Sequence, residues 1–194
     1  MPYVDLAFRI VGKTIPVDHG YSLYSAISRI IPDIHASKET GIHPIRGTYS
    51  GDGTLLLTSS SRLILRVPDT QISTCLKLAG KRLDVERNTL RVGVPEVRLL
   101  RPAAKLRARL VTFKNSLEEV RFLEVARERL DKLQVAGELE LGQRRTLRVK
   151  DKQVVGFELA IGNLSAEESL SLQENGLGGR RHMGCGVLIP AKAS

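Results

Sequence analysis

One pattern constrains the fold of this chain more than any other, because the same order of strands and helices is predicted in both halves. In the first half, apolar and polar residues that alternate near the start of segment 3–11 predict a strand. The elements expected after it are a helix over 21–31, short strands over 44–50 and 62–67, a helix over 69–79, and strands over 82–86 and 90–94. This β-α-β-β-α-β order is that of the ferredoxin-like unit.

The second half repeats this order. It is expected to contain strands over 105–113, 138–149, 153–161 and 186–189, with a helix after the first and after the third of them. Ser116 and Glu119 have the spacing of a capping box that begins the first of these helices. Ser165 and Glu168 have the same spacing before the second helix. The first helix has apolar residues at helical spacing: Leu117, Val120, Leu123, Ala126, Leu130 and Leu133.

These patterns together predict an α+β protein of two tandem ferredoxin-like (RRM-like) domains. The N-terminal domain is expected over residues 1–102, and the C-terminal domain over residues 103–194. The join between them lacks low-complexity sequence and is too short for the domains to tumble independently.

The charge of the chain favours a polyanionic partner. Thirty Lys and Arg residues face 21 Asp and Glu residues, which gives a formal net charge of +9. Aromatic residues make up only 4% of the chain, and there is no Trp, so extensive base stacking on aromatic platforms is not expected. Tyr49 and Phe113 can stack on a base, but both are expected to fill the core.

Several classes of protein are disfavoured. No cluster of Cys and His has the spacing of metal ligands, so neither a metal nor another cofactor is expected. No apolar stretch reaches the roughly eighteen residues of a membrane helix, and the start of the chain lacks the layout of a signal peptide. We therefore expect a cytoplasmic protein, with Cys75 and Cys185 as small core residues.

The most unusual segment is 175–186, NGLGGRRHMGCG, which has five glycines, two adjacent arginines and a histidine. Glycines let backbone N–H groups approach a phosphate closely, and Arg180 and Arg181 add charge-assisted donors. The spacing is not that of a nucleotide-binding P-loop. A flexible turn between helix and strand is the alternative, and the paired arginines favour phosphate binding.

This segment resembles the glycine-rich loop of the repeat-associated RNA-binding superfamily of CRISPR systems, as do the helix before it and the strand VLIP after it. The segments DHGYSLYSAIS and GIHPIRG resemble the repeat-processing endoribonucleases of that superfamily, and the likeness covers essentially the whole chain. It implies metal-independent cleavage of precursor CRISPR RNA within its repeats. The ribose 2′-oxygen attacks the neighbouring phosphate and leaves a 2′,3′-cyclic phosphate and a 5′-hydroxyl.

Such a reaction needs one group that takes the 2′ proton and another that protonates the leaving 5′-oxygen. Histidine suits both tasks because its ordinary pKa lies near 6.5. The resemblance implies a catalytic pair of Tyr24, inside the first helix, and His35, just past its end. His43, in GIHPIRG, is the chief rival, and His19 is expected to be a cap or hinge residue. Two nearby basic residues are candidates for stabilising the charged phosphate: Lys38 and Arg46.

A second basic group lies on the hairpin predicted around 143–152. The resemblance implies that this hairpin grips the RNA stem, mainly through its phosphates. The alternative is a solvated edge that its charges keep from pairing with another strand. The residues expected to contact RNA are Arg144, Arg145 and Arg148 on the hairpin, and Gly176, Gly178, Gly179, Arg180, Arg181 and His182 in the glycine-rich loop.

Two other functions remain open. A non-catalytic CRISPR-RNA-binding subunit of an effector complex would have the same fold, but it would not need the histidines near Tyr24. An unrelated tandem RNA-recognition protein would need exposed aromatic residues on its sheets, and this chain has few. The expected partners are CRISPR repeat RNA and other CRISPR effector subunits, and the chain is expected to be a monomer or a homodimer without membrane contact.

Overall fold

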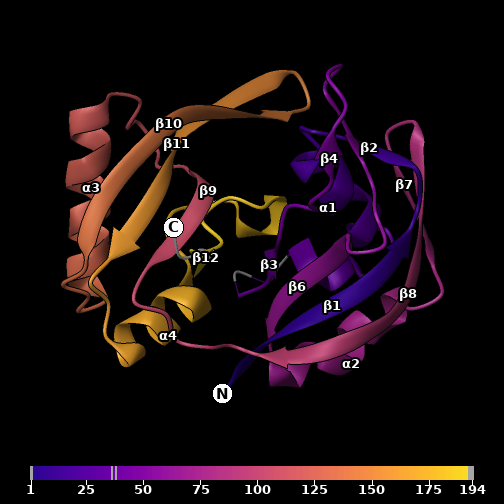
Figure 1. The fold of residues 1–194 in the computed structure, drawn as a ribbon, viewed down its shortest axis with the longest axis horizontal. Coiled ribbons are helices and arrows are strands. Elements are labelled where there is room, and N and C mark those ends of the chain that lie inside the picture. The colour runs from indigo at the N-terminus through magenta and orange to yellow at the C-terminus, as the bar shows by residue number, and fades with distance from the viewer. Residues whose placement is uncertain (1, 36, 38, 192–194) are drawn as a thin grey trace. The chain divides into compact units, whose positions relative to one another are not determined.

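The computed structural model describes residues 2–35, 37 and 39–191. The chain forms two compact units, Met1–Leu99 and Leu100–Ser194, and each is built on one main antiparallel sheet (Figure 1). Among the described residues, no helix is both long enough and apolar enough to cross a membrane.

The main sheet of the first unit has the strand order β3-β6-β1-β8-β7. Its elements, in chain order, are β1 (Tyr3–Val11), α1 (Gly20–Ser28), β3 (Gly41–Ile42), β6 (Arg62–Pro68), α2 (Ile72–Cys75), β7 (Arg82–Val85) and β8 (Asn88–Leu99). Four of these strands have the ferredoxin-like order, and β7 is added at the edge by a hairpin with β8. A smaller sheet consists of β2 (Thr14–Pro16), β5 (Thr54–Leu56) and β4 (Thr48–Tyr49).

The second unit has the order β10-β11-β9-β12, which is again ferredoxin-like. Its elements are β9 (Leu106–Val111), α3 (Glu119–Lys132), β10 (Glu138–Val149), β11 (Lys152–Gly162), α4 (Ala166–Asn175) and β12 (Ile189–Pro190). Phe122 of α3 and Phe157 of β11 are fully buried, with ring centroids 4.9 Å apart, in the core between helix and sheet. The predicted fold class of two tandem ferredoxin-like domains is confirmed.

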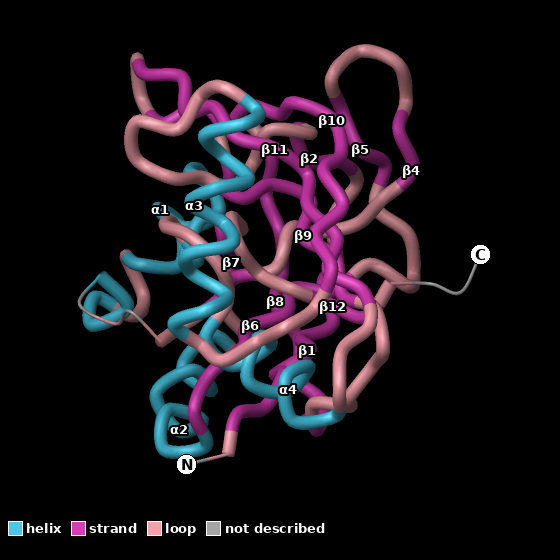
Figure 2. Tube along the Cα trace, turned by 90° about the vertical axis from the view of Figure 1, so that its left-hand side faces the viewer, coloured by secondary structure: helices cyan, strands magenta, loops and turns pink. Residues whose placement is uncertain are grey.

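Two of the helices that the sequence predicts are shorter in the structure, and short 3₁₀ turns lie beside them (Figure 2). The first helix ends at Ser28, and Pro32 instead begins a 3₁₀ turn, Pro32–His35. The expected helix over 69–79 is only one turn of α-helix, α2, between the 3₁₀ turns Asp69–Gln71 and Leu76–Leu78. A further 3₁₀ turn, Arg181–Met183, lies inside the glycine-rich segment.

One of the two predicted capping boxes is wrong. Ser116 does not cap α3, because its hydroxyl donates to the carbonyl of Lys114 and the helix begins three residues later. The later start changes the apolar stripe, so that Leu117 and Val120 are exposed. The residues of α3 that are buried are Phe122, Ala126 and Leu130.

The other capping box is confirmed at the start of α4. The Ser165 hydroxyl accepts a hydrogen bond from the Glu168 backbone N–H at 3.2 Å. The Glu168 carboxylate accepts one from the Ser165 backbone N–H at 2.8 Å. Both N-terminal backbone donors are therefore satisfied, which fixes where this helix begins.

Candidate functional site

A buried polar network joins three adjacent strands of the first unit. Strand register places Asp5 of β1 opposite Arg66 of β6, and Arg66 opposite Gly41 of β3. The Arg66 guanidinium donates from Nε to Asp5 Oδ1 at 2.8 Å and from Nη2 to Oδ2 at 2.9 Å. On the other side of the carboxylate, His43 Nε2 lies 3.4 Å from Oδ1. Arg66 is 1% exposed and His43 8% exposed, so the carboxylate lies between two enclosed nitrogen groups.

This network sets the charge of its members. Burial raises the pKa of Asp5, but the hydrogen bonds and charges of His43 and Arg66 outweigh it and hold that pKa below its usual range. Burial lowers the pKa of His43, and the positive charges of Arg66 and Arg46 lower it further, against the opposing effect of Asp5. At neutral pH, therefore, Asp5 is ionised and His43 is neutral.

The contact between His43 and Asp5 is looser than that between Arg66 and Asp5. A distance of 3.4 Å is long for an N–H···O hydrogen bond, and His43 Nε2 has no other hydrogen-bond partner among the described residues. The His43 backbone N–H donates to the Ile64 carbonyl at 2.9 Å, which extends the β3–β6 pairing by one residue. The backbone hydrogen bond of His43 is therefore shorter and better formed than the contact of its ring with Asp5.

His19 is a structural residue. Its ring is 1% exposed, with Nδ1 2.6 Å from the Pro16 carbonyl and Nε2 accepting from the Ile45 backbone N–H at 3.0 Å. Since Nε2 accepts, Nδ1 carries the proton and donates to Pro16. The neutral ring therefore ties the start of α1 to the segment that contains His43.

Of the predicted pair of Tyr24 and His35, the structure describes all of Tyr24 but only the backbone of His35. Tyr24 lies on the buried side of α1, 7% exposed, and burial, with the neighbouring Tyr21, raises its pKa. The backbone of His35 ends the 3₁₀ turn after α1. The side chain of His35 and the whole of Lys38 lie outside the described residues, so their contact with Tyr24 stays a prediction.

Two backbone hydrogen bonds join the glycine-rich segment to the end of β9. Gly186 donates from its backbone N–H to the Leu110 carbonyl at 2.7 Å, and Gly179 donates to the Thr112 carbonyl at 3.1 Å. At Gly178 the backbone has a φ of +81°, and an added Cβ would lie 2.6 Å from the Thr112 carbonyl oxygen. An added Cβ at Gly179 would meet no atom within 4 Å. The fold therefore requires glycine at position 178 but not at 179.

The two adjacent arginines of this segment have different surroundings. Arg180 is exposed, in a left-handed backbone conformation. Arg181 is buried and packs over Gly176, where an added Cβ would lie 2.7 Å from Arg181 Nε. His182 is half-buried. Arg180 is therefore the arginine of this pair that is open to a ligand.

An apolar cluster holds the segment against the β10–β11 hairpin. Leu110, Leu147 and Cys185 are buried together, with Met183 packed against them. A bulge in β10 between Leu141 and Arg144 shifts the register and reverses which residues face each side of the hairpin. Beyond the bulge, Leu147 therefore faces the glycine-rich segment and is buried against it.

The arginines on this hairpin also differ. Arg145 donates from Nε and Nη2 to Glu158 Oε1 at 2.8 and 2.6 Å, so its charge is balanced within the unit. Arg144 and Arg148 are exposed. Among the described residues, no group of three or more His, Cys, Asp or Glu side chains is placed to hold a metal ion.

Comparison with known proteins decides the family. The model of the Cas6 CRISPR family matches residues 4–193. The chain belongs to the Cas6 family. It is 42% identical over 190 residues to a protein of Myxococcus xanthus (strain DK1622) named CRISPR-associated endonuclease Cas6, which covers 98% of this chain and 82% of that protein. The resemblance drawn from the glycine-rich segment and the two N-terminal motifs is confirmed.

Solved Cas6 structures share this fold. One described as a CRISPR-associated protein Cas6 has a TM-score of 0.67 at 12% identity, and the match covers 98% of this chain and 99% of that one. A Thermus thermophilus Cse3, solved bound to an RNA that represents a pre-cleavage complex, has a TM-score of 0.58 at 14% identity, over 99% of this chain and 100% of that one. Both units of this chain contain the ferredoxin-like strand order, β3-β6-β1-β8 in the first unit and β10-β11-β9-β12 in the second.

Asp5 and Arg66 are not among the residues that the sequence predicts for the site. No motif links them, because they are 61 residues apart and only the register of β1 and β6 brings them together. The usable signal was weak: Asp5 and Arg66 each stand between two apolar residues of a strand, in VDL and LRV. A charged side chain that is buried among apolar residues lowers the stability of the fold unless it has a partner of opposite charge. One acidic and one basic residue at such positions therefore indicate a pair.

Proposed function

We propose that this Cas6 family protein is an endoribonuclease that cuts precursor CRISPR RNA within its repeats. The observation that carries the proposal is the 42% identity, over nearly the whole chain, to a protein named a CRISPR-associated endonuclease. Such an enzyme needs side chains that bind phosphates and side chains that transfer protons. In this proposal, exposed basic residues of the second unit bind the phosphates, and titratable residues around α1 transfer the protons.

The chemistry proposed is metal-independent transesterification. The 2′-oxygen loses its proton to a base and attacks the adjacent phosphorus, and the 5′-oxygen leaves with a proton from an acid. His35 is the lead catalytic residue, with Tyr24 as its partner, because the family resemblance implies this pair and the backbone of His35 ends the 3₁₀ turn after α1. His43 is the rival, and its lowered pKa leaves it neutral and able to accept a proton, although its ring is largely enclosed.

The two domains have different tasks in this proposal. The N-terminal domain, 1–102, carries the cleavage residues, and the C-terminal domain, 103–194, grips the RNA. Arg144, Arg148 and Arg180 are the phosphate contacts, since all three are exposed. Gly179 lets the RNA backbone approach, because the fold itself leaves open space there. The remaining predicted RNA-binding residues support these contacts: Arg145, Gly176, Gly178, Arg181 and His182.

The test is incubation of the full chain with a labelled repeat RNA in EDTA, followed by analysis of the product ends. We expect cleavage, with a cyclic phosphate on the upstream product and a 5′-hydroxyl on the downstream one. An RNA with 2′-deoxyribose before the cut should bind but stay intact, because the nucleophile is missing. Activity that is lost in EDTA and restored by a divalent ion would contradict the mechanism. Tight binding without any cleavage would favour the non-catalytic RNA-binding subunit.

A further inference from the structure

Four arginines from four strands of the first unit lie on one face of its main sheet. Register places Arg9 of β1 directly opposite Arg62 of β6. On the other side of β1, Val11 lies opposite Arg91 of β8, which in turn lies opposite Arg82 of β7. Directly opposite residues share a face, and so do residues two apart along a strand. The four arginines therefore form two neighbouring rows, which we call the arginine surface.

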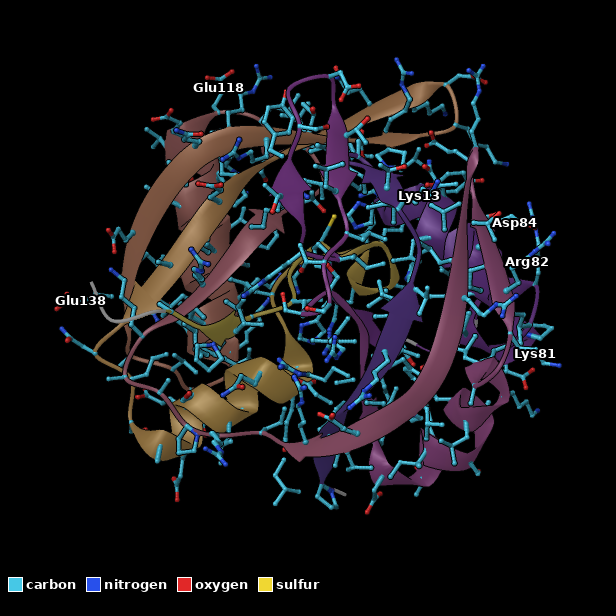
Figure 3. All side chains as sticks on the ribbon, turned by 45° about the vertical axis from the view of Figure 1, so that its right-hand side comes forward. Lys13, Lys81, Arg82, Asp84, Glu118 and Glu138 are labelled. Atoms are coloured by element: carbon cyan, nitrogen blue, oxygen red, sulfur yellow. The ribbon has the colours of Figure 1, made fainter. Side chains whose placement is uncertain are left out.

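The arginine surface is on the face of the sheet opposite to the helices, at the end away from the buried Asp5–Arg66 pair. On the other face, Leu6 and Phe8 of β1 and Leu83 of β7 are buried, and α1 packs against β7 while α2 packs against β6. Arg9, Arg82 and Arg91 are exposed, and Val11 between them is 71% exposed. Figure 3 labels Arg82 and Asp84, which lie on β7 at the edge of this sheet. Arg9, Arg82 and Arg91 are therefore accessible, and Arg62 is half-buried.

The charges on this surface are only partly balanced. Asp84 Oδ1 lies 3.5 Å from Arg82 Nε, and Arg62 Nη1 donates to the carbonyls of Ser59 and Ser61 at 2.6 and 2.8 Å. Arg9 and Arg91 make no ion pair with another described residue. Like charges placed directly opposite in a sheet destabilise it, and this sheet has two such pairs, Arg9 with Arg62 and Arg82 with Arg91. The free protein therefore carries a repulsion that a bound anion would relieve.

A nearby carboxylate reports the same excess of positive charge. A hydrogen bond from Arg98 holds the pKa of Glu96 below its usual value, and the charges of Arg62 and Arg9 lower it further. Glu96 is already bound to Arg98 at 2.9 Å, so it does not neutralise Arg9 or Arg62 as a direct partner. The charges of Arg9 and Arg62 thus reach Glu96, which offsets part of them without pairing with either arginine.

We propose that the arginine surface is a second RNA-binding site, which holds the phosphates of an RNA strand. Neighbouring strands are about 4.8 Å apart and residues two apart on a strand about 7 Å apart, so the guanidinium groups can span consecutive phosphates. On the same face, the neighbours of Arg9 and Arg62 are Ala7 and Ile64, not the aromatic residues that base stacking would need. The contact is therefore to the backbone and independent of sequence. The proposal rests on the proposed RNA-processing function.

The test is the double variant Arg9→Gln with Arg91→Gln, both in the full chain. The dissociation constant for repeat RNA is measured across a series of salt concentrations. Two lost phosphate contacts should lower the slope of log K against log salt by about 1.4, at about 0.7 for each contact with a single strand. Without RNA, the melting temperature of the variant should equal or exceed that of the wild type, because repulsion has been removed. Arg9→Lys with Arg91→Lys should keep the wild-type slope, since the charges remain.

Arg121→Gln is the matched control. Arg121 is exposed on α3 and ion-paired with Glu124, so its loss should leave affinity and slope unchanged. Wild-type affinity and slope in the Arg9/Arg91 glutamine variant would overturn the RNA site and leave an acidic protein as the partner for these arginines. A fall in melting temperature would overturn the argument from repulsion. Failure of the wild type to bind any repeat RNA would overturn the proposed function as well, which separates the two outcomes.

Discussion

At the residue scale, His19 and His43 of the first unit differ in how many contacts hold each ring. His19 uses both ring nitrogens for backbone contacts, so it has no nitrogen left for proton transfer. His43 keeps one loose contact to Asp5 and is largely enclosed. The ring of His35 lies outside the described residues, and its backbone ends the 3₁₀ turn after α1. The structure therefore removes His19 as a proton-transfer group and leaves His43 enclosed, and His35 stays the lead residue of our proposal because the family resemblance implies it.

His35→Ala should therefore lower the cleavage rate by roughly 10² or more, the scale of a positioned general acid or base. RNA affinity should hardly change, because one neutral imidazole adds little beside many arginines. Single-turnover cleavage and a binding titration measure the two quantities separately. His43→Ala is the control of matched chemistry. If it abolishes cleavage while His35→Ala does not, the catalytic histidine is His43.

The glycines of the glycine-rich segment give a second prediction. Gly178→Ala should lower the melting temperature, because the new Cβ would clash with the Thr112 carbonyl in a backbone with positive φ. Gly179→Ala should leave the melting temperature unchanged and weaken RNA binding, because only the RNA would meet its Cβ. Thermal melts and binding titrations of both variants check this. Equal RNA affinity for Gly179→Ala and wild type would remove Gly179 from the interface.

At the element scale, the Asp5–Arg66 pair joins β1 to β6 under the start of β3. Asp5→Ala should lower the free energy of unfolding at pH 7 by about 3–5 kcal/mol, since it leaves a buried guanidinium without its carboxylate. The folded-state pKa of Asp5 is lowered, so its contribution is present above the unfolded pKa of about 3.9 and is lost as the pH falls through the folded value. The gap between wild type and variant in denaturant melts should therefore narrow only below about pH 4. A gap that widens as the pH falls from 7 to 6 would instead show that His43 is protonated there and paired with Asp5.

Elements with a self-contained signal were predictable from sequence, and elements that depend on tertiary packing were not. The capping box at Ser165 works because both of its hydrogen bonds are local. The same spacing at Ser116 fails because the chain turns through Asn115, with φ of +59°, and the helix starts later. For the candidate site, the glycine-rich segment and the histidines carried local motifs. The Asp5–Arg66 pair and the arginine surface exist only through strand register, which a single sequence does not specify.

At the scale of the whole molecule, the net charge of +9 is spread over two units, and each presents exposed arginines. If a single RNA contacts both units, the phosphate contacts of each should add in the salt dependence of binding. Arg144→Gln with Arg180→Gln, in the second unit, should lower the slope by about 1.4 for a single-stranded contact, as should Arg9→Gln with Arg91→Gln in the first. The quadruple variant should then lower it by about 2.8, with one RNA bound per chain in every case. A quadruple variant no worse than one of the pairs would mean that the RNA is held by one unit alone, because contacts that never form cannot contribute to the slope.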